Sequence, residues 1–76
     1  MNDLLRMPDV RRVSSLARPT IYRDIRRGTF PKPVKIGAVS AWPAAEIAAV
    51  NAARIAGKSD DDIRQLVAEL QRQRAA

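Results

Sequence analysis

The chain of 76 residues contains fourteen basic and eight acidic side chains, with neither cysteine nor histidine. This composition excludes disulfides and the usual zinc ligand sets, so we expect no metal and no cofactor. No apolar segment is long enough for a signal peptide or for the roughly 20 residues of a membrane span. We therefore expect a cytoplasmic protein without a membrane partner.

The charge is distributed unevenly along the chain. Residues 1–35 contain nine basic and three acidic residues, a surplus of six, whereas residues 36–76 contain five of each. The whole net charge of +6 therefore lies in the first half. A basic segment of this kind is typical of proteins that bind nucleic acid, and a merely solvated basic surface is the alternative.

The first predicted element is a short helix over residues 8–13. Pro8 suits the first turn of a helix, and Val10 and Val13 lie on one face because they are three residues apart. The hydroxyl residues that follow break this pattern, so residues 14–17 are expected to form a tight turn.

A second helix is predicted from Arg18 to Arg27. Pro19 suits its first turn, and Gly28 is a typical residue just beyond a helix end. Ile21 and Ile25 are four residues apart and should face the core. The opposite side should carry Thr20, Arg23 and Arg27, with Tyr22 and Arg26 on a flank. Two short helices joined by a turn indicate a helix-turn-helix unit.

A β-hairpin is predicted after the second helix. Residues 34–36 alternate apolar, polar and apolar, as in a half-buried strand, and residues 40–42 can return after a turn at 37–39. An isolated hairpin is marginal in water, so it must pack on the helices, with Trp42 and Phe30 as core residues. This hairpin would be the wing of a winged helix-turn-helix.

Two further helices complete the predicted fold. Pro43 opens a third helix, whose apolar positions are Ile47, Val50 and Ile55. Ser59, followed by three aspartates, predicts the start of a fourth helix. Its apolar stripe consists of Ile63, Leu66, Val67 and Leu70. The predicted fold is therefore mainly α with a small β-hairpin, a winged helix-turn-helix with an additional C-terminal helix.

We divide the chain into a DNA-binding domain, residues 1–57, and a C-terminal amphipathic helix, residues 58–76. The stripe of this helix could fold back on its own domain or pair with a second copy, and we slightly favour a homodimer. Its last residues, 71–76, are expected to fray.

Several unlike residues at fixed spacing resemble the AlpA family of prophage and mobile-element regulators. They are Arg18, Thr20, Ile21, Tyr22 and Arg23, then Gly28, Phe30, Pro31 and Pro33, then Gly37, Trp42, Glu46 and Ile47. The resemblance spans about residues 4–56. It implies a winged helix-turn-helix related to excisionases and to MerR-type activators, whose second helix enters the major groove of DNA. It also implies a role in phage transcription or in excision.

The chain departs from the family pattern at several positions. Ala17 and Pro19 stand where the family has hydroxyl residues, so the second helix loses a side-chain N-cap worth about 1 kcal/mol. The wing tip, residues 38–40, lacks the basic residue that the family commonly places there. Val50 replaces a second tryptophan and suggests a smaller core contact.

The candidate DNA contacts follow from these patterns. Arg18, Thr20 and Arg23 are predicted to face base pairs, and Tyr22 is equally compatible with a core position. The residues predicted to hold phosphates are Arg26, Arg27, Lys32 and Lys35.

The predicted function is sequence-specific binding of double-stranded DNA by a transcriptional regulator of a prophage or mobile element. An excision factor is an alternative, as is an adaptor that binds a recombinase or RNA polymerase through its C-terminal helix. We expect no enzymatic activity, because the chain lacks histidine and a glycine-rich phosphate loop, and its small core leaves little room for a ligand cavity.

Overall fold

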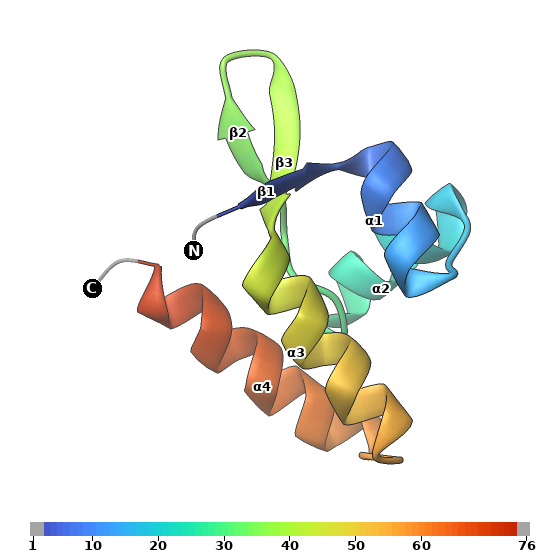
Figure 1. Cartoon of the computed structure of the whole chain (residues 1–76). Coiled ribbons are helices and arrows are strands. Elements are labelled where there is room, and N and C mark those ends of the chain that lie inside the picture. The colour runs from blue at the N-terminus through green and yellow to red at the C-terminus, as the bar shows by residue number, and fades with distance from the viewer. Residues whose placement is uncertain (1–2, 75–76) are drawn as a thin grey trace.

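The computed structural model describes residues 3–74 and has four helices and a small antiparallel sheet (Figure 1). The elements in chain order are β1 (Leu4–Arg6), α1 (Met7–Ser14), α2 (Arg18–Arg27), β2 (Val34–Ile36), β3 (Val39–Pro43), α3 (Ala44–Ile55) and α4 (Asp60–Gln73). This arrangement confirms the predicted mainly helical fold with a hairpin and is consistent with a winged helix-turn-helix. No helix in the described part of the chain is long and apolar enough to cross a membrane.

The bounds of α1 and α2 follow the predicted signals. Each helix has a proline in its first turn and ends at a residue in the left-handed region, Ser15 with φ 59° and Gly28 with φ 80°. Ala17, at the N-cap of α2, provides no side-chain hydrogen bond, because a methyl group cannot accept one. The local sequence therefore fixes where the second helix begins and ends.

The sheet contains one strand more than the sequence predicted. β3 lies in the centre with β1 and β2 antiparallel on either side, and Leu5 pairs with Trp42. The strand predicted at 34–36 is present, but the burial expected for Ile36 is wrong, because this residue is 51% exposed. The β2–β3 hairpin projects beyond the helices in Figure 1, and no helix within residues 3–74 covers its tip. We call this hairpin the wing.

The main core lies between the sheet and helices α1, α2 and α3. Its fully buried residues are Val10, Ile21, Phe30, Trp42 and Ile47, which confirms the core positions predicted for Phe30 and Trp42. The Trp42 indole N–H donates a hydrogen bond of 2.8 Å to the carbonyl of Pro31. This bond attaches the central strand to the loop that follows α2.

A second core joins α3 to α4, which lie side by side in Figure 1. Val50 packs with Ile63 and Val67, and Leu66 and Leu70 are partly buried against them. The chain itself covers Ile63 and Val67, which agrees with the alternative that the stripe folds back on its own domain, and the homodimer through this stripe stays a prediction. The same packing removes these two side chains from any adaptor surface. The proposed boundary at residue 57 stays a prediction.

Two further expectations about the C-terminal half need correction. Ile55 does not join the apolar stripe of α3, since it is 87% exposed near the end of the helix. The prediction that the chain frays from residue 71 is also wrong. Helix α4 continues to Gln73, and the side chains of Gln71 and Arg74 both bond to other parts of the chain. Ala75 and Ala76 lie outside the described residues.

The second core predicts how α4 contributes to stability. Ile63→Ala should lower the free energy of unfolding by about 2–3 kcal/mol, because it removes buried apolar volume. Ile55→Ala, the matched exposed substitution, should cost less than about 0.5 kcal/mol. Urea unfolding followed by circular dichroism measures both, and the midpoints should not depend on protein concentration. A concentration-dependent midpoint would instead indicate that the stripe is buried between copies.

Candidate nucleic-acid interface

The outer face of α2 is basic. Arg23, Arg26 and Arg27 are exposed, whereas Asp24, the one acid of this helix, is only 6% exposed. Thr20 is half-buried, so only part of its side chain is accessible. The solvent side of α2 therefore presents three guanidinium groups, of which that of Arg23 is also paired with Asp24.

Arg18 and Tyr22 lie where α2 approaches the wing. The Arg18 guanidinium stands 5.4 Å from the centre of the half-buried Tyr22 ring, a distance at which cation and ring attract each other. The two side chains line a groove of about 310 Å³ together with Arg6 and Ser40. Arg6 was not among the predicted contacts, because it belongs to β1, the strand that the sequence did not predict.

The two predicted lysines lie in different parts of the structure. Lys35 is on β2, where its ammonium donates to the Ser40 hydroxyl on β3 at 2.7 Å. Lys32 is in the loop before β2 with an exposed side chain, and its backbone is bonded by α4. Both residues are exposed, Lys32 before the base of the wing and Lys35 in the middle of β2.

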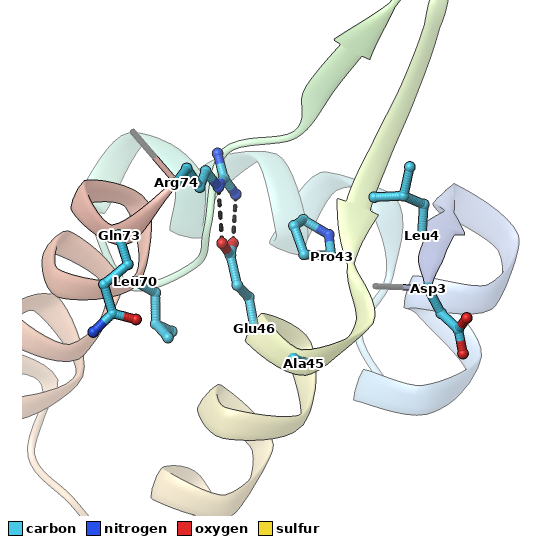
Figure 2. Close-up of a pocket in the computed structure, with 8 residues that line it drawn as sticks. All are labelled: Asp3, Leu4, Pro43, Ala45, Glu46, Leu70, Gln73 and Arg74. Atoms are coloured by element: carbon cyan, nitrogen blue, oxygen red, sulfur yellow. Dashed lines mark hydrogen bonds and ion pairs between the residues drawn. The ribbon is translucent and has the colours of Figure 1, made fainter. Parts of the chain in front are cut away.

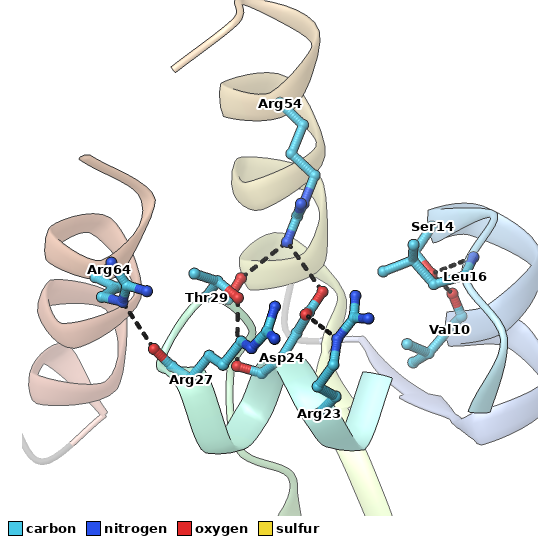
Figure 3. Close-up of polar contacts among 9 residues, drawn as sticks. All are labelled: Val10, Ser14, Leu16, Arg23, Asp24, Arg27, Thr29, Arg54 and Arg64. Atoms are coloured by element: carbon cyan, nitrogen blue, oxygen red, sulfur yellow. Dashed lines mark hydrogen bonds and ion pairs between the residues drawn. The ribbon is translucent and has the colours of Figure 1, made fainter. Parts of the chain in front are cut away.

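A polar network holds the inner side of α2 against α3 (Figure 3). The Asp24 carboxylate is 3.5 Å from Nε of Arg23 and 3.6 Å from Nη2 of Arg54, which lies on α3. The same Arg54 nitrogen donates to the Thr29 carbonyl at 3.0 Å. Sequence reasoning missed this network, because periodicity does not indicate which arginine meets a buried acid.

Helix α4 bonds to both ends of the loop between α2 and the wing. Arg64 donates from Nε to the carbonyl of Arg27 at 2.8 Å, as Figure 3 shows. Gln71 accepts from the backbone N–H of Lys32 at 2.8 Å, and Arg74 donates to the Lys32 carbonyl at 2.8 Å. The C-terminal helix therefore fixes the segment that carries the predicted phosphate contacts.

Arg74 also forms a paired contact with the buried Glu46 at the start of α3 (Figure 2). Nε of Arg74 donates to the carboxylate at 2.8 Å. The pair borders an open pocket of about 480 Å³, which Leu4 and Leu70 also line. Because its two charges neutralise each other, the pocket offers no free charged group from this pair.

Elsewhere, a hydrogen bond from Arg72 lowers the pKa of Glu69 below its ordinary value, although desolvation acts in the opposite direction. This exposed pair lies on α4, outside the predicted DNA contacts. Residues 3–74 contain no cluster of acids that could hold a metal ion.

Comparison with known proteins identifies the family. Residues 3–54 match the family of the prophage CP4-57 regulatory protein AlpA. The chain belongs to this family. A protein of Enterobacteria phage P4, described as uncharacterized protein ORF88, is 46% identical over 55 residues, which cover 71% of this chain and 62% of that protein. No solved structure matches.

The match confirms the resemblance to the AlpA family that was inferred from the spacing of residues 18–47. The matched segment contains β1, both helices of the helix-turn-helix, the wing and most of α3. Helix α4 lies beyond it, although its side chains bond to the loop after α2.

The Glu46–Arg74 pair yields a test of the contribution of α4. Arg74→Ala should lower the free energy of unfolding by about 1–3 kcal/mol, because it leaves a buried carboxylate without its partner. Arg72→Ala, which breaks the exposed pair with Glu69 on the same helix, should leave the urea midpoint unchanged within error. Equal effects of the two substitutions would show that the Glu46 pair is no stronger than a surface pair.

Proposed function

We propose that this AlpA-family protein binds double-stranded DNA in a sequence-specific manner and thereby regulates transcription in a prophage or mobile element. The observation that carries the proposal is the outer face of α2, where Arg23, Arg26 and Arg27 are exposed and the one acid is turned inward. Arginine suits this task, since its planar guanidinium can pair with phosphates and with guanine edges.

In this proposal α2 enters the major groove, which admits one helix. Arg23 and Arg18 contact base edges, and Thr20 adds at most a contact from its accessible part. Tyr22 acts by supporting the Arg18 guanidinium that lies over its ring. Arg26 and Arg27 contact the phosphates on either side of the groove.

The wing follows the DNA backbone next to the groove. Lys32 before β2 and Lys35 in the middle of β2 contact phosphates, which sets the register of α2 without selecting a sequence. Arg6 adds a third such contact from β1, because it shares the groove beside the wing with Arg18. The wing tip contributes little charge, since Ala38 and Val39 are apolar.

Sequence-specific binding can be tested by fluorescence anisotropy on the upstream promoter DNA and on scrambled DNA across a salt series. The promoter should be preferred by about 10³ or more, and the affinity should fall steeply with salt. Arg23→Ala should cost about 1–3 kcal/mol of binding free energy and relax the preference at one base pair. Lys35→Ala should weaken all sequences about equally.

Lys58→Ala is the charge-matched control, because Lys58 is exposed in the turn between α3 and α4. It should change the affinity much less than Lys35→Ala. If Arg23→Ala and Lys35→Ala had the same effect on every sequence, the division into base and phosphate contacts would be wrong. Absence of binding to either DNA at low salt would refute the proposed function.

The Arg6 contact yields a separate prediction. Arg6→Ala should weaken promoter and scrambled DNA alike and reduce the salt slope by about one, as expected for the loss of one phosphate contact. Arg12→Ala serves as the control, since Arg12 lies on α1 with 71% of its side chain exposed and does not line the groove. An unchanged salt slope for Arg6→Ala would remove β1 from the interface.

A further inference from the structure

Asp24 lies between two guanidinium groups that come from different helices (Figure 3). Its two carboxylate oxygens face Arg23 at 3.5 Å and Arg54 at 3.6 Å, and these are its only ion pairs within residues 3–74. The acid itself is 6% exposed. A buried carboxylate of this kind needs a cation beside it, because an unpaired charge in the interior is strongly unfavourable.

The two arginines are held very differently. Arg54 projects from α3 and also donates to the Thr29 carbonyl at 3.0 Å, so two contacts fix its guanidinium. Arg23 has half of its side chain exposed, and its one bond, to Asp24, is 3.5 Å long. Arg23 can therefore leave Asp24 more easily than Arg54 can.

We infer that Arg54 is a positioning residue for DNA binding: it is the permanent counter-cation of Asp24 and so allows Arg23 to turn from Asp24 to the DNA. The inference rests on the proposed role of Arg23 at the major groove. When Arg23 moves to the DNA, Asp24 keeps the ion pair with Arg54, and no buried charge is left alone.

Loss of Arg54 reverses this situation. Arg23 then becomes the sole cation beside Asp24, and its transfer to DNA leaves an uncompensated carboxylate in the protein interior. The free energy needed to separate Arg23 from Asp24 weakens DNA binding only through the contact that Arg23 makes. The effect on DNA recognition should therefore resemble the loss of Arg23 itself, although Arg54 does not touch the DNA.

The first test is a double-mutant cycle between residues 54 and 23 on promoter DNA and its single-base-pair variants. Arg54→Met retains aliphatic bulk and removes the charge, and it should weaken promoter binding about tenfold. The loss should fall on the base pair that Arg23→Ala affects. Added to Arg23→Ala, Arg54→Met should cost less than a further twofold or so, because the interaction it supports is already gone.

A second variant separates positioning from stability. Asp24→Asn combined with Arg54→Met has no carboxylate at position 24, so it folds without an unpaired charge there and Arg23 is free. Its promoter affinity should return to within about threefold of the unsubstituted protein. Thermal unfolding of each variant is recorded, and binding is measured well below the transition.

Two results would overturn the inference. One is an additive loss when Arg54→Met is combined with Arg23→Ala; the other is a double variant at 24 and 54 that binds as weakly as Arg54→Met alone. If Arg23→Ala weakens binding and Arg54→Met does not, the inference fails and the proposed function stands. If Arg23→Ala leaves promoter binding unchanged, the proposed role of α2 fails, and the inference fails with it.

Discussion

The complete burial of Trp42 ties the wing to the helix-turn-helix. Its strand, β3, is the centre of the sheet, and its ring packs with Val10 of α1 and Ile21 of α2. The indole N–H meets the carbonyl of Pro31 in the loop that follows α2. Because one rigid side chain contacts all these parts, the distance between the wing and the outer face of α2 cannot change without exposing the largest apolar group of the core.

A chain this short cannot rely on that core alone, since small domains bury only about 60% of their unfolded surface. Helix α4 supplies a second core on α3, and it also bonds the backbone at both Arg27 and Lys32. The loop between α2 and the wing is thus held by Trp42 on one side and by α4 on the other. For this reason the helix beyond the family match forms part of the DNA-binding architecture that we propose.

Signals that act within one turn of the chain were sufficient to predict most of the fold. Proline, glycine and serine at helix ends determine local backbone geometry, and the structure follows them closely in α1, α2 and α4. Strand β1 could not be predicted, because the partner of Leu5, Trp42, lies beyond two helices and another strand in the sequence. The exposed arginines of α2 followed from periodicity, but Arg6 and Arg54 depend on contacts between elements distant in sequence.

Two buried carboxylates, Asp24 and Glu46, account for the ion pairs of Arg54 and Arg74. Asp24 pairs with Arg54 of α3, and Glu46 pairs with Arg74, the residue directly after α4, although well-packed apolar residues in these places would often be equally stabilising. Ion pairs and carbonyl bonds are directional, so they select one orientation. In this protein that orientation decides which side chains of α2 face outward, and hence which face the DNA would meet.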